Sequence, residues 1–282
     1  MVEYVDINGA RLAYRLAGPP GAPLIITLHG GRGFGDHKSD FKAYSPLSSK
    51  YRVLSFDFRG HGQSSRTEPY TFSQIVADIE GLRKHPRLGD NKPCIIIGGS
   101  FGGFLAQQYA ITYPSHVSHL ILRGTAPSYH HEEKAVSVLQ DRLQRAPGLS
   151  VKMLQDKIFG KFDSDIEFQL VMHAAAPLYS EDFNADAALE RNLETVFFAK
   201  SHNDLYSQPE KFFDYREKLA TVTAKTLVVV GDHDWICPPQ QSQLIASLIP
   251  NSRLEIIKGA NHSVHLEKNE EVINLILQHL SS

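Results

Sequence analysis

A serine between glycines stands where nucleophilic chemistry is expected. The segment 98–103 reads Gly-Gly-Ser-Phe-Gly-Gly and contains the pattern Gly-x-Ser-x-Gly around Ser100. It follows an apolar run at 94–97 and opens a helical pattern that extends to Tyr113. Glycines beside a nucleophile permit a sharp turn between strand and helix, and the helix N-terminus then directs its amides towards developing negative charge. We therefore predict that Ser100 attacks a carbonyl group, rather than serving merely as a helix cap.

A serine nucleophile needs a general base and a carboxylate that orients the base. Two loops late in the chain, each directly after an apolar run, supply candidates: 231–235 reads Gly-Asp-His-Asp-Trp, and 258–262 reads Lys-Gly-Ala-Asn-His. We predict His262 as the base, with His265, better suited to packing, as the alternative. We predict Asp234 as the acid, because it lies deeper in its loop than Asp232, which suits a turn carboxylate.

Negative charge on the attacked oxygen requires backbone donors close to Ser100. We predict these donors to be the amides of Phe101 and Gly31, the latter from the loop 29–35, which reads His-Gly-Gly-Arg-Gly-Phe-Gly after an apolar run. His29 is then expected to tie loops together. A phosphate-binding loop is the competing interpretation, but the glycine spacing differs from Gly-x-Gly-x-x-Gly and no Gly-Lys-Ser/Thr follows.

The elements that must position these residues alternate along the chain. Asn8-Gly9 between two alternating segments predicts a hairpin. Apolar runs that predict strands recur at 24–28, 51–56, 94–97, 117–122, 226–230 and 253–257. Helical patterns occupy 71–82, 101–113, 239–248 and 270–280. Strands that alternate with helices predict an α/β fold with a mostly parallel sheet, and the catalytic candidates follow the carboxyl ends of its strands.

One long segment breaks this alternation. Between 126 and 219 the pattern is helical and contains no comparable apolar strand. We predict that 126–219 is a helical cap (lid) inserted into a core domain made of 1–125 and 220–282. Tyr129-His130-His131-Glu132-Glu133, near the start of this segment, is expected to form a hydrated surface, because adjacent histidines do not converge on one metal ion.

Composition restricts the partners. Of 282 residues 42% are hydrophobic and 21% charged, and the formal net charge is −2, so we expect neither a nucleic acid nor a membrane partner. The 14 histidines lack metal-ligand spacing, so we expect no metal and no organic cofactor. Two distant cysteines and an N-terminus without a signal-peptide pattern predict a cytoplasmic protein. The expected partner is a small molecule or short peptide; the pattern gives no oligomeric state.

Taken together, these motifs resemble the α/β-hydrolase family, whose fold is a mostly parallel twisted sheet with flanking helices and a helical cap. The resemblance includes 57–64, Asp-Phe-Arg-Gly-His-Gly-Gln-Ser, and covers nearly the whole chain. The doubled glycines around Ser100, with His29-Gly30-Gly31, are most similar to the proline iminopeptidase (prolyl aminopeptidase) branch. The resemblance supports Asp234 over Asp232, because the family's acid normally stands three residues after the loop's glycine.

Three residues depart from the iminopeptidase pattern. Arg32 stands where that branch usually has proline, and Phe58 where it has glutamine. Iminopeptidases hold the substrate's ammonium with two carboxylates. Asp204 is a candidate for the first, but Trp235 occupies the position of the second, and an indole face attracts a cation more weakly.

We therefore predict a serine hydrolase acting on an ester, lactone or amide of a small, largely apolar substrate. The predicted substrate contacts are Gly30, Arg32, Phe34, Trp235 and Asp204. Two alternatives remain open. One is an aminopeptidase that releases N-terminal residues, and the other is a non-hydrolytic cyclase, acyltransferase or ligand receptor on the same scaffold.

Overall fold

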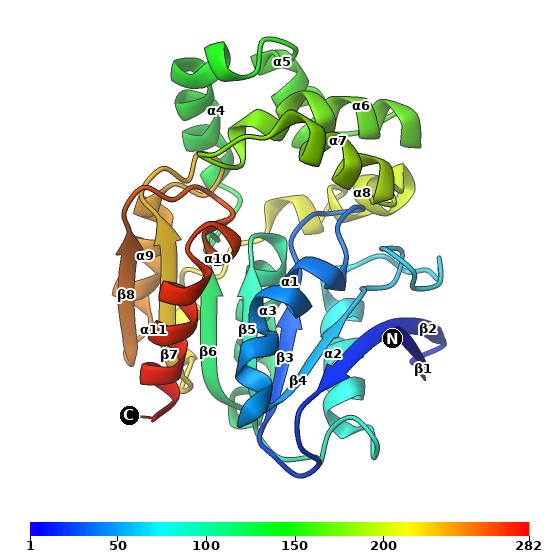
Figure 1. Ribbon diagram of the computed structural model, residues 1–282, viewed down its shortest axis with the longest axis vertical. Helices are drawn as coiled ribbons and strands as arrows, with labels where there is room; N and C mark the ends of the chain where they lie inside the picture. The colour runs from blue at the N-terminus through cyan, green and yellow to red at the C-terminus, as the bar shows by residue number, and fades with distance from the viewer. Residues whose placement is uncertain (282) are drawn as a thin grey trace.

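An eight-stranded sheet forms the centre of the computed structural model, which describes residues 1–281 (Figure 1). The strand order is β1-β2-β4-β3-β5-β6-β7-β8. The first two pairs, β1 with β2 and β2 with β4, are antiparallel, and all later pairs are parallel. The strands are β1 (Glu3–Ile7), β2 (Ala10–Ala17), β3 (Leu24–Leu28), β4 (Arg52–Phe56), β5 (Cys94–Gly99), β6 (Val117–Arg123), β7 (Lys225–Gly231) and β8 (Ser252–Ile257).

The predicted hairpin joins β1 to β2. Asn8 and Gly9 both have positive φ, at 48° and 79°, and the strands pair from Ile7 with Ala10 onwards. Positive φ at both central positions is the geometry of a type I′ turn, which matches the twist of the two strands. The antiparallel edge of an otherwise parallel sheet is therefore set by these two residues.

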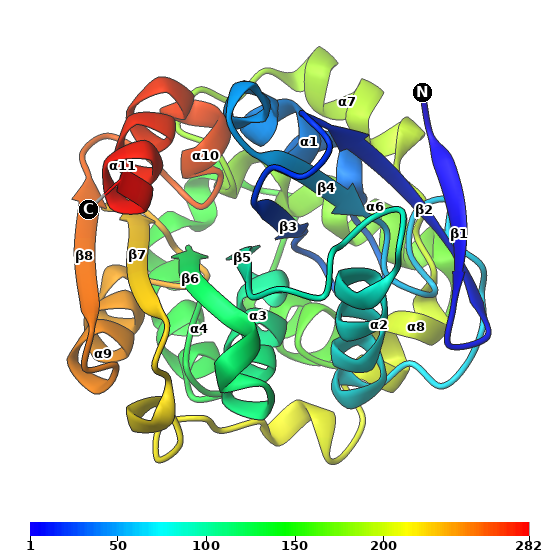
Figure 2. The ribbon, with the colours of Figure 1, turned by 90° about the horizontal axis from the view of Figure 1, so that it is seen from below.

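Helices cover both faces of the sheet (Figure 2). Successive strand residues alternate between two hydrophobic clusters, so that Ile25 belongs to one and Ile26 to the other. One face carries α2 (Phe72–Lys84), α3 (Phe101–Thr112) and α9 (Pro239–Leu248). The opposite face carries α1 (His37–Tyr44), α10 (Val264–Glu267) and α11 (Asn269–Ser281). The central strands are buried on both sides, as their continuous apolar sequences predict.

A helical layer lies over the carboxyl ends of the strands, between β6 and β7 in the chain (Figure 1). It contains α4 (His131–Arg142), α5 (Val151–Met153), α6 (Asp165–Ala175), α7 (Ala185–Glu194) and α8 (Ala199–Leu205). Where the chain enters and leaves this layer, Tyr129 donates its amide to Phe213 and Tyr215 donates to Pro127. The two connections therefore lie side by side. Within residues 1–281, no helix is both long and apolar enough to cross a membrane.

Four histidines are buried where the helical layer meets the sheet's loops. His202 of α8 bonds through Nδ1 to the carbonyl of Arg32 at 3.0 Å, and His61 accepts the amide of Gly33 at 2.8 Å. His131 bonds to the carbonyl of Ser128, and His265 lies 3.5 Å from the carboxylate of Asp40. Burial lowers the pKa to about 3 for His61 and His202. It lowers the pKa to about 4 for His131 and His265.

These histidines should make the fold sensitive to acid. Below pH 6.5 the unfolded chain takes up protons that the folded chain excludes, so stability falls as the pH falls and is unaffected well above 6.5. At pH 5 each of these histidines lowers the free energy of unfolding by about 2 kcal/mol. We expect His202→Asn to reduce the difference in unfolding free energy between pH 7 and pH 5 by roughly that amount, measured by urea titration. In the control, His85→Asn on a partly exposed loop, the difference should stay at the wild-type value.

Candidate active site

Ser100 lies at the turn between β5 and α3 in a strained backbone conformation. Its φ is 53° and its ψ is −122°, which non-glycine residues rarely adopt, at a cost of roughly 1–3 kcal/mol. The turn is held from both sides: the amide of Ser100 donates to the carbonyl of Arg123 at 3.0 Å, and the hydroxyl of Thr125 donates to the carbonyl of Ser100 at 2.8 Å. Ser100 is thus presented at the end of the strand, at the start of the helix.

The glycines on either side of Ser100 are required by close packing. A Cβ on Gly98 would lie 2.4 Å from the carbonyl oxygen of Gly102, and a Cβ on Gly102 would lie 2.0 Å from that of Leu28. Neither distance is possible for real atoms. The Gly-x-Ser-x-Gly pattern therefore records how closely α3 approaches both its own strand and β3.

His262 and Asp234 meet at the same edge of the sheet. His262 donates from Nδ1 to Oδ2 of Asp234 at 2.8 Å, which leaves its Nε2 available as an acceptor. The other oxygen, Oδ1, accepts the amides of Ile236 at 3.1 Å and Cys237 at 2.9 Å. The carboxylate is therefore fixed by its own loop. Asp232 instead accepts the amide of Gly259, as expected of a turn carboxylate.

The loop after β3 passes directly beside Ser100. A Cβ on Gly30 would lie 3.1 Å from Cβ and 3.7 Å from Oγ of Ser100. Gly31 has φ 85°, and a Cβ there would meet the carbonyl of Phe34 at 2.6 Å. His29 stacks on Phe58 with centroids 4.0 Å apart and bonds through Nδ1 to the carbonyl of Gly30 at 2.8 Å, so it ties this loop in place. The oxyanion roles of Gly31 and Phe101 stay a prediction.

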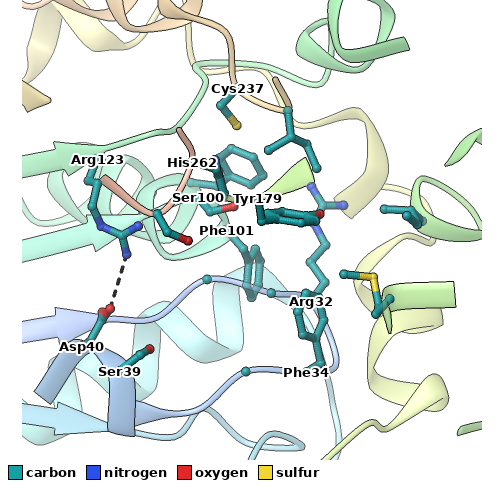
Figure 3. Close-up of a pocket in the computed structure, with 18 of the residues that line it drawn as sticks. Arg32, Phe34, Ser39, Asp40, Ser100, Phe101, Arg123, Tyr179, Cys237 and His262 are labelled. Atoms are coloured by element: carbon teal, nitrogen blue, oxygen red, sulfur yellow. Dashed lines mark hydrogen bonds and ion pairs between the residues drawn. The ribbon is translucent and has the colours of Figure 1, made fainter. Parts of the chain in front are cut away.

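Ser100, His262, Gly30 and Gly31 line one cavity of about 250 Å³ beneath the helical layer (Figure 3). Figure 3 draws Ser100 and His262 next to each other, with Phe101 below them and Tyr179 beside them. Of the residues expected to contact substrate, Gly30, Arg32 and Phe34 line the cavity. The helical layer contributes His131, Ile158, Phe159, Met172, Tyr179, His202 and Tyr206 to the lining. A wider hollow of about 440 Å³ shares Phe34, Met172, Tyr179, Ser263 and Leu266 with it.

Charged groups on the core side of the cavity compensate one another. Arg123 lies 3.3 Å from Oδ1 of Asp40 (Figure 3). His265 lies 3.5 Å from the same oxygen. The pKa of Asp40 is lowered, since these neighbours outweigh the effect of its burial. This cluster could not be predicted from the sequence, because its members come from α1, β6 and α10.

Two predicted contact residues do not line the cavity. Asp204 lies outside it, and its carboxylate pairs with Lys200 at 2.8 Å and is partly exposed. Trp235 is fully buried behind the lining, where its ring packs against Tyr179 with centroids 5.4 Å apart. The prediction that they contact substrate is therefore corrected: Asp204 is turned away on α8, and Tyr179 covers Trp235.

The expectation that 129–133 forms a hydrated surface is wrong for His131. Its side chain is buried and lines the cavity, with its ring packed against Phe104 and Phe213. His131 begins α4 and faces inwards, whereas His130 precedes the helix and is partly exposed. A pair of adjacent histidines in the sequence does not indicate which one faces the core. Among residues 1–281, no group of three or more His, Cys, Asp or Glu is placed to hold a metal ion.

The chain matches a known family model and is similar in sequence to proteins of known name. Residues 23–269 match the family model described as alpha/beta hydrolase fold. The chain is 63% identical over 280 residues to the proline iminopeptidase PfmaB of Pestalotiopsis fici, covering 99% of both proteins. It is 28% identical to a proline iminopeptidase of Arabidopsis thaliana, over 90% of this chain and 72% of that protein.

Solved structures agree on the fold. The meta-cleavage product hydrolase CumD superposes with a TM-score of 0.76 at 21% identity, covering 99% of this chain and 97% of that one. An esterase from Exiguobacterium antarcticum superposes with a TM-score of 0.76 at 20% identity, covering all of both chains.

Gly30→Ala tests how tightly the loop after β3 abuts Ser100. The φ of Gly30 is ordinary, so the added methyl group acts through its contacts, of which the tightest is with Cβ of Ser100 at 3.1 Å. We expect kcat to fall by about tenfold to a hundredfold, because displacements below 1 Å at a reacting atom are costly. The melting temperature should change little. The control is Gly148→Ala, whose methyl group would make an ordinary contact with Ala174; neither residue lines the cavity. Equal activity of the two variants would contradict the close approach.

Proposed function

The chain is a hydrolase that belongs to the alpha/beta hydrolase fold family, and we propose that it cleaves an ester, lactone or amide of a small, largely apolar substrate through an acyl-enzyme on Ser100. The observation that supports this most is that His262, which lines the same cavity as Ser100, is held by a hydrogen bond to the buried carboxylate of Asp234. The volume of about 250 Å³ and the aromatic lining suit a small apolar group.

The proposed reaction has two acyl-transfer steps. Nε2 of His262 takes the proton of Ser100 as Oγ attacks the carbonyl carbon, and the amides of Gly31 and Phe101 stabilise the resulting oxyanion. His262 then gives the proton to the leaving alcohol or amine, which departs and leaves an ester on Ser100. Water attacks this ester with the same base, and the acid product leaves with Ser100 restored. Asp234 keeps the Nδ1 proton of His262 in place and stabilises the imidazolium.

The name of the 63% identical relative favours a second candidate, an aminopeptidase that releases N-terminal proline. Such an enzyme must bind a free ammonium group, which needs a carboxylate once it is desolvated. Among the described residues, Asp40 is the one carboxylate that lines the cavity, and Arg123 and His265 already neighbour it. We therefore propose acyl hydrolysis without amine recognition as the function.

The helical layer at 126–219 is proposed as the cap that closes this cavity, since seven of its side chains line it. A reducing, intracellular location is also proposed. Cys94 and Cys237 are free and buried thiols, and burial raises the pKa of both.

Replacement of the nucleophile tests the mechanism. We expect Ser100→Ala to lower kcat on a p-nitrophenyl ester by about three orders of magnitude or more, because the remaining groups cannot form the acyl-enzyme. Mass spectrometry after incubation with an aryl phosphonate should find one adduct, on the peptide that contains Ser100. The control, Ser247→Ala on the exposed side of α9, should keep wild-type activity and labelling. An adduct on any other residue would overturn the assignment.

Blocking the amine separates the two candidate functions. Prolyl-β-naphthylamide and its N-acetyl derivative share a leaving group and differ in the charge on the proline nitrogen. We expect the acetylated amide to be cleaved at least as fast as the free one, measured as kcat/KM by naphthylamine fluorescence. A loss of tenfold or more on acetylation would favour the aminopeptidase instead.

A further inference from the structure

Arg32 is a buried cation without an ionic partner. Its side chain is 4% exposed, and its Nη1 donates to the carbonyl of Leu205 at 3.1 Å. Its Nη2 is buried and has no hydrogen-bond partner. Among residues 1–281, no carboxylate lies within ion-pair distance of the guanidinium. A buried charge is normally paired, so the Nη2 donor of Arg32 needs an acceptor that the described residues do not supply.

Aromatic rings account for part of this arrangement. The guanidinium carbon lies 3.9 Å from the centroid of Tyr206, and four further rings stand at 5.2–5.7 Å: Phe72, Phe101, Phe104 and Phe213. Such faces attract a cation, yet they accept no directed hydrogen bond from Nη2. Glu132 feels the charge of Arg32 only at longer range, and burial raises its pKa to about 7. These five rings form an aromatic cage that surrounds the guanidinium but leaves Nη2 without a hydrogen-bond acceptor in the described part of the chain.

The backbone of Arg32 is fixed between the core and the helical layer. Its carbonyl accepts from His202 of α8 at 3.0 Å, and the next residue, Gly33, donates to His61. A Cβ on Gly33 would lie 2.5 Å from the amide nitrogen of His202, so the loop is wedged against α8. An arginine held in this way loses little further freedom when it binds an anion.

Arg32 also shares the cavity with the reacting groups. It stands two residues after Gly30, which abuts Ser100, and its guanidinium packs over the ring of Phe101, which follows Ser100. Figure 3 shows its side chain rising from the loop beside Phe34 towards Tyr179. At the other end of the cavity Arg123 is compensated by Asp40. Of the two arginines in the lining, Arg123 therefore has an ion-pair partner and Arg32 has none within residues 1–281.

We propose that Arg32 binds a carboxylate of the substrate, so that this hydrolase acts on small apolar or aromatic acyl compounds that carry a carboxylate away from the scissile carbonyl. This rests on the proposed function of Ser100 and adds the substrate class to it. A carboxylate supplies the acceptor that Nη2 lacks and neutralises the buried charge, whereas a substrate ammonium would be repelled.

Three substrates with one leaving group test the proposal. They are the p-nitrophenyl esters of terephthalic acid, of its monomethyl ester and of p-(aminomethyl)benzoic acid, which place a negative, neutral or positive group at the same site. The rigid ring prevents the carboxylate from attacking its own ester. The isophthalic series varies the distance. We expect the wild-type kcat/KM to be highest for a carboxylate, by tenfold or more over its neutral ester, and lowest for the ammonium.

Variants connect this preference to Arg32. In Arg32→Gln the ratio of kcat/KM for the carboxylate ester to kcat/KM for the neutral ester should fall at least tenfold, mainly through a higher KM for the carboxylate ester. Arg32→Lys should restore part of the preference, because it keeps the charge and loses the planar fork. The control is Arg66→Gln, which removes an exposed arginine stacked on Phe198 outside the cavity and should keep the full preference.

If Arg32→Gln fails to fold, inhibition of the wild-type enzyme tests the same proposal. Competitive inhibition by p-toluate should be at least tenfold tighter than inhibition by p-toluamide. Equal inhibition by the two compounds, or an unchanged substrate preference in Arg32→Gln, overturns the proposal. Arg32 would then have a structural role only. A failure of the proposed function would give a different result: Ser100→Ala would still hydrolyse all three esters.

Discussion

The turn at Ser100 is the constraint on which the rest of the structure depends. Its positive-φ backbone persists because the carbonyl of Arg123, at the end of β6, and the hydroxyl of Thr125, in the loop after β6, hold it with hydrogen bonds. Its shape also requires α3 to pass so close to β3 that Gly102 accepts no side chain. The relative positions of β3, β5, β6 and α3 are therefore fixed together with that of Ser100. A sheet buried on both faces provides the rigidity that such strain needs.

The features that were predictable from the sequence are those set by local patterns. The hairpin at Asn8-Gly9 and the buried strands follow from turn chemistry and apolar runs, and the contact between Asp234 and His262 follows because neighbouring parallel strands end at one edge. The lining of the cavity was not predictable in the same way. Asp204 sits on a helix whose rotation one sequence does not reveal, and it turned outwards.

The position of His131 in the cavity and the Asp40–Arg123–His265 cluster were likewise not predictable from the sequence. Each brings together segments more than 80 residues apart, or depends on which face of a helix meets the core. Arg32 combines both cases. Its loop and its departure from the family's proline were visible in the sequence, whereas the surrounding cage comes from α2, α3 and the helical layer. Its charge was predictable, and its lack of a partner was not.

Chemistry and recognition depend on different parts of this molecule. The proposed reacting groups stand on loops of the sheet, and the fold of this sheet is shared with solved structures of about 20% identity to this chain. The substrate-facing surface comes largely from the helical layer and from the loop 30–35, so similarity over the whole chain says more about the bond-breaking step than about the substrate. An enzyme that binds an ammonium group needs excess negative charge in its cavity. Around this cavity Asp40 lies beside Arg123 and Asp234 is paired with His262, so the charged group left without an ion-pair partner among the described residues is the cation of Arg32, which favours a carboxylate.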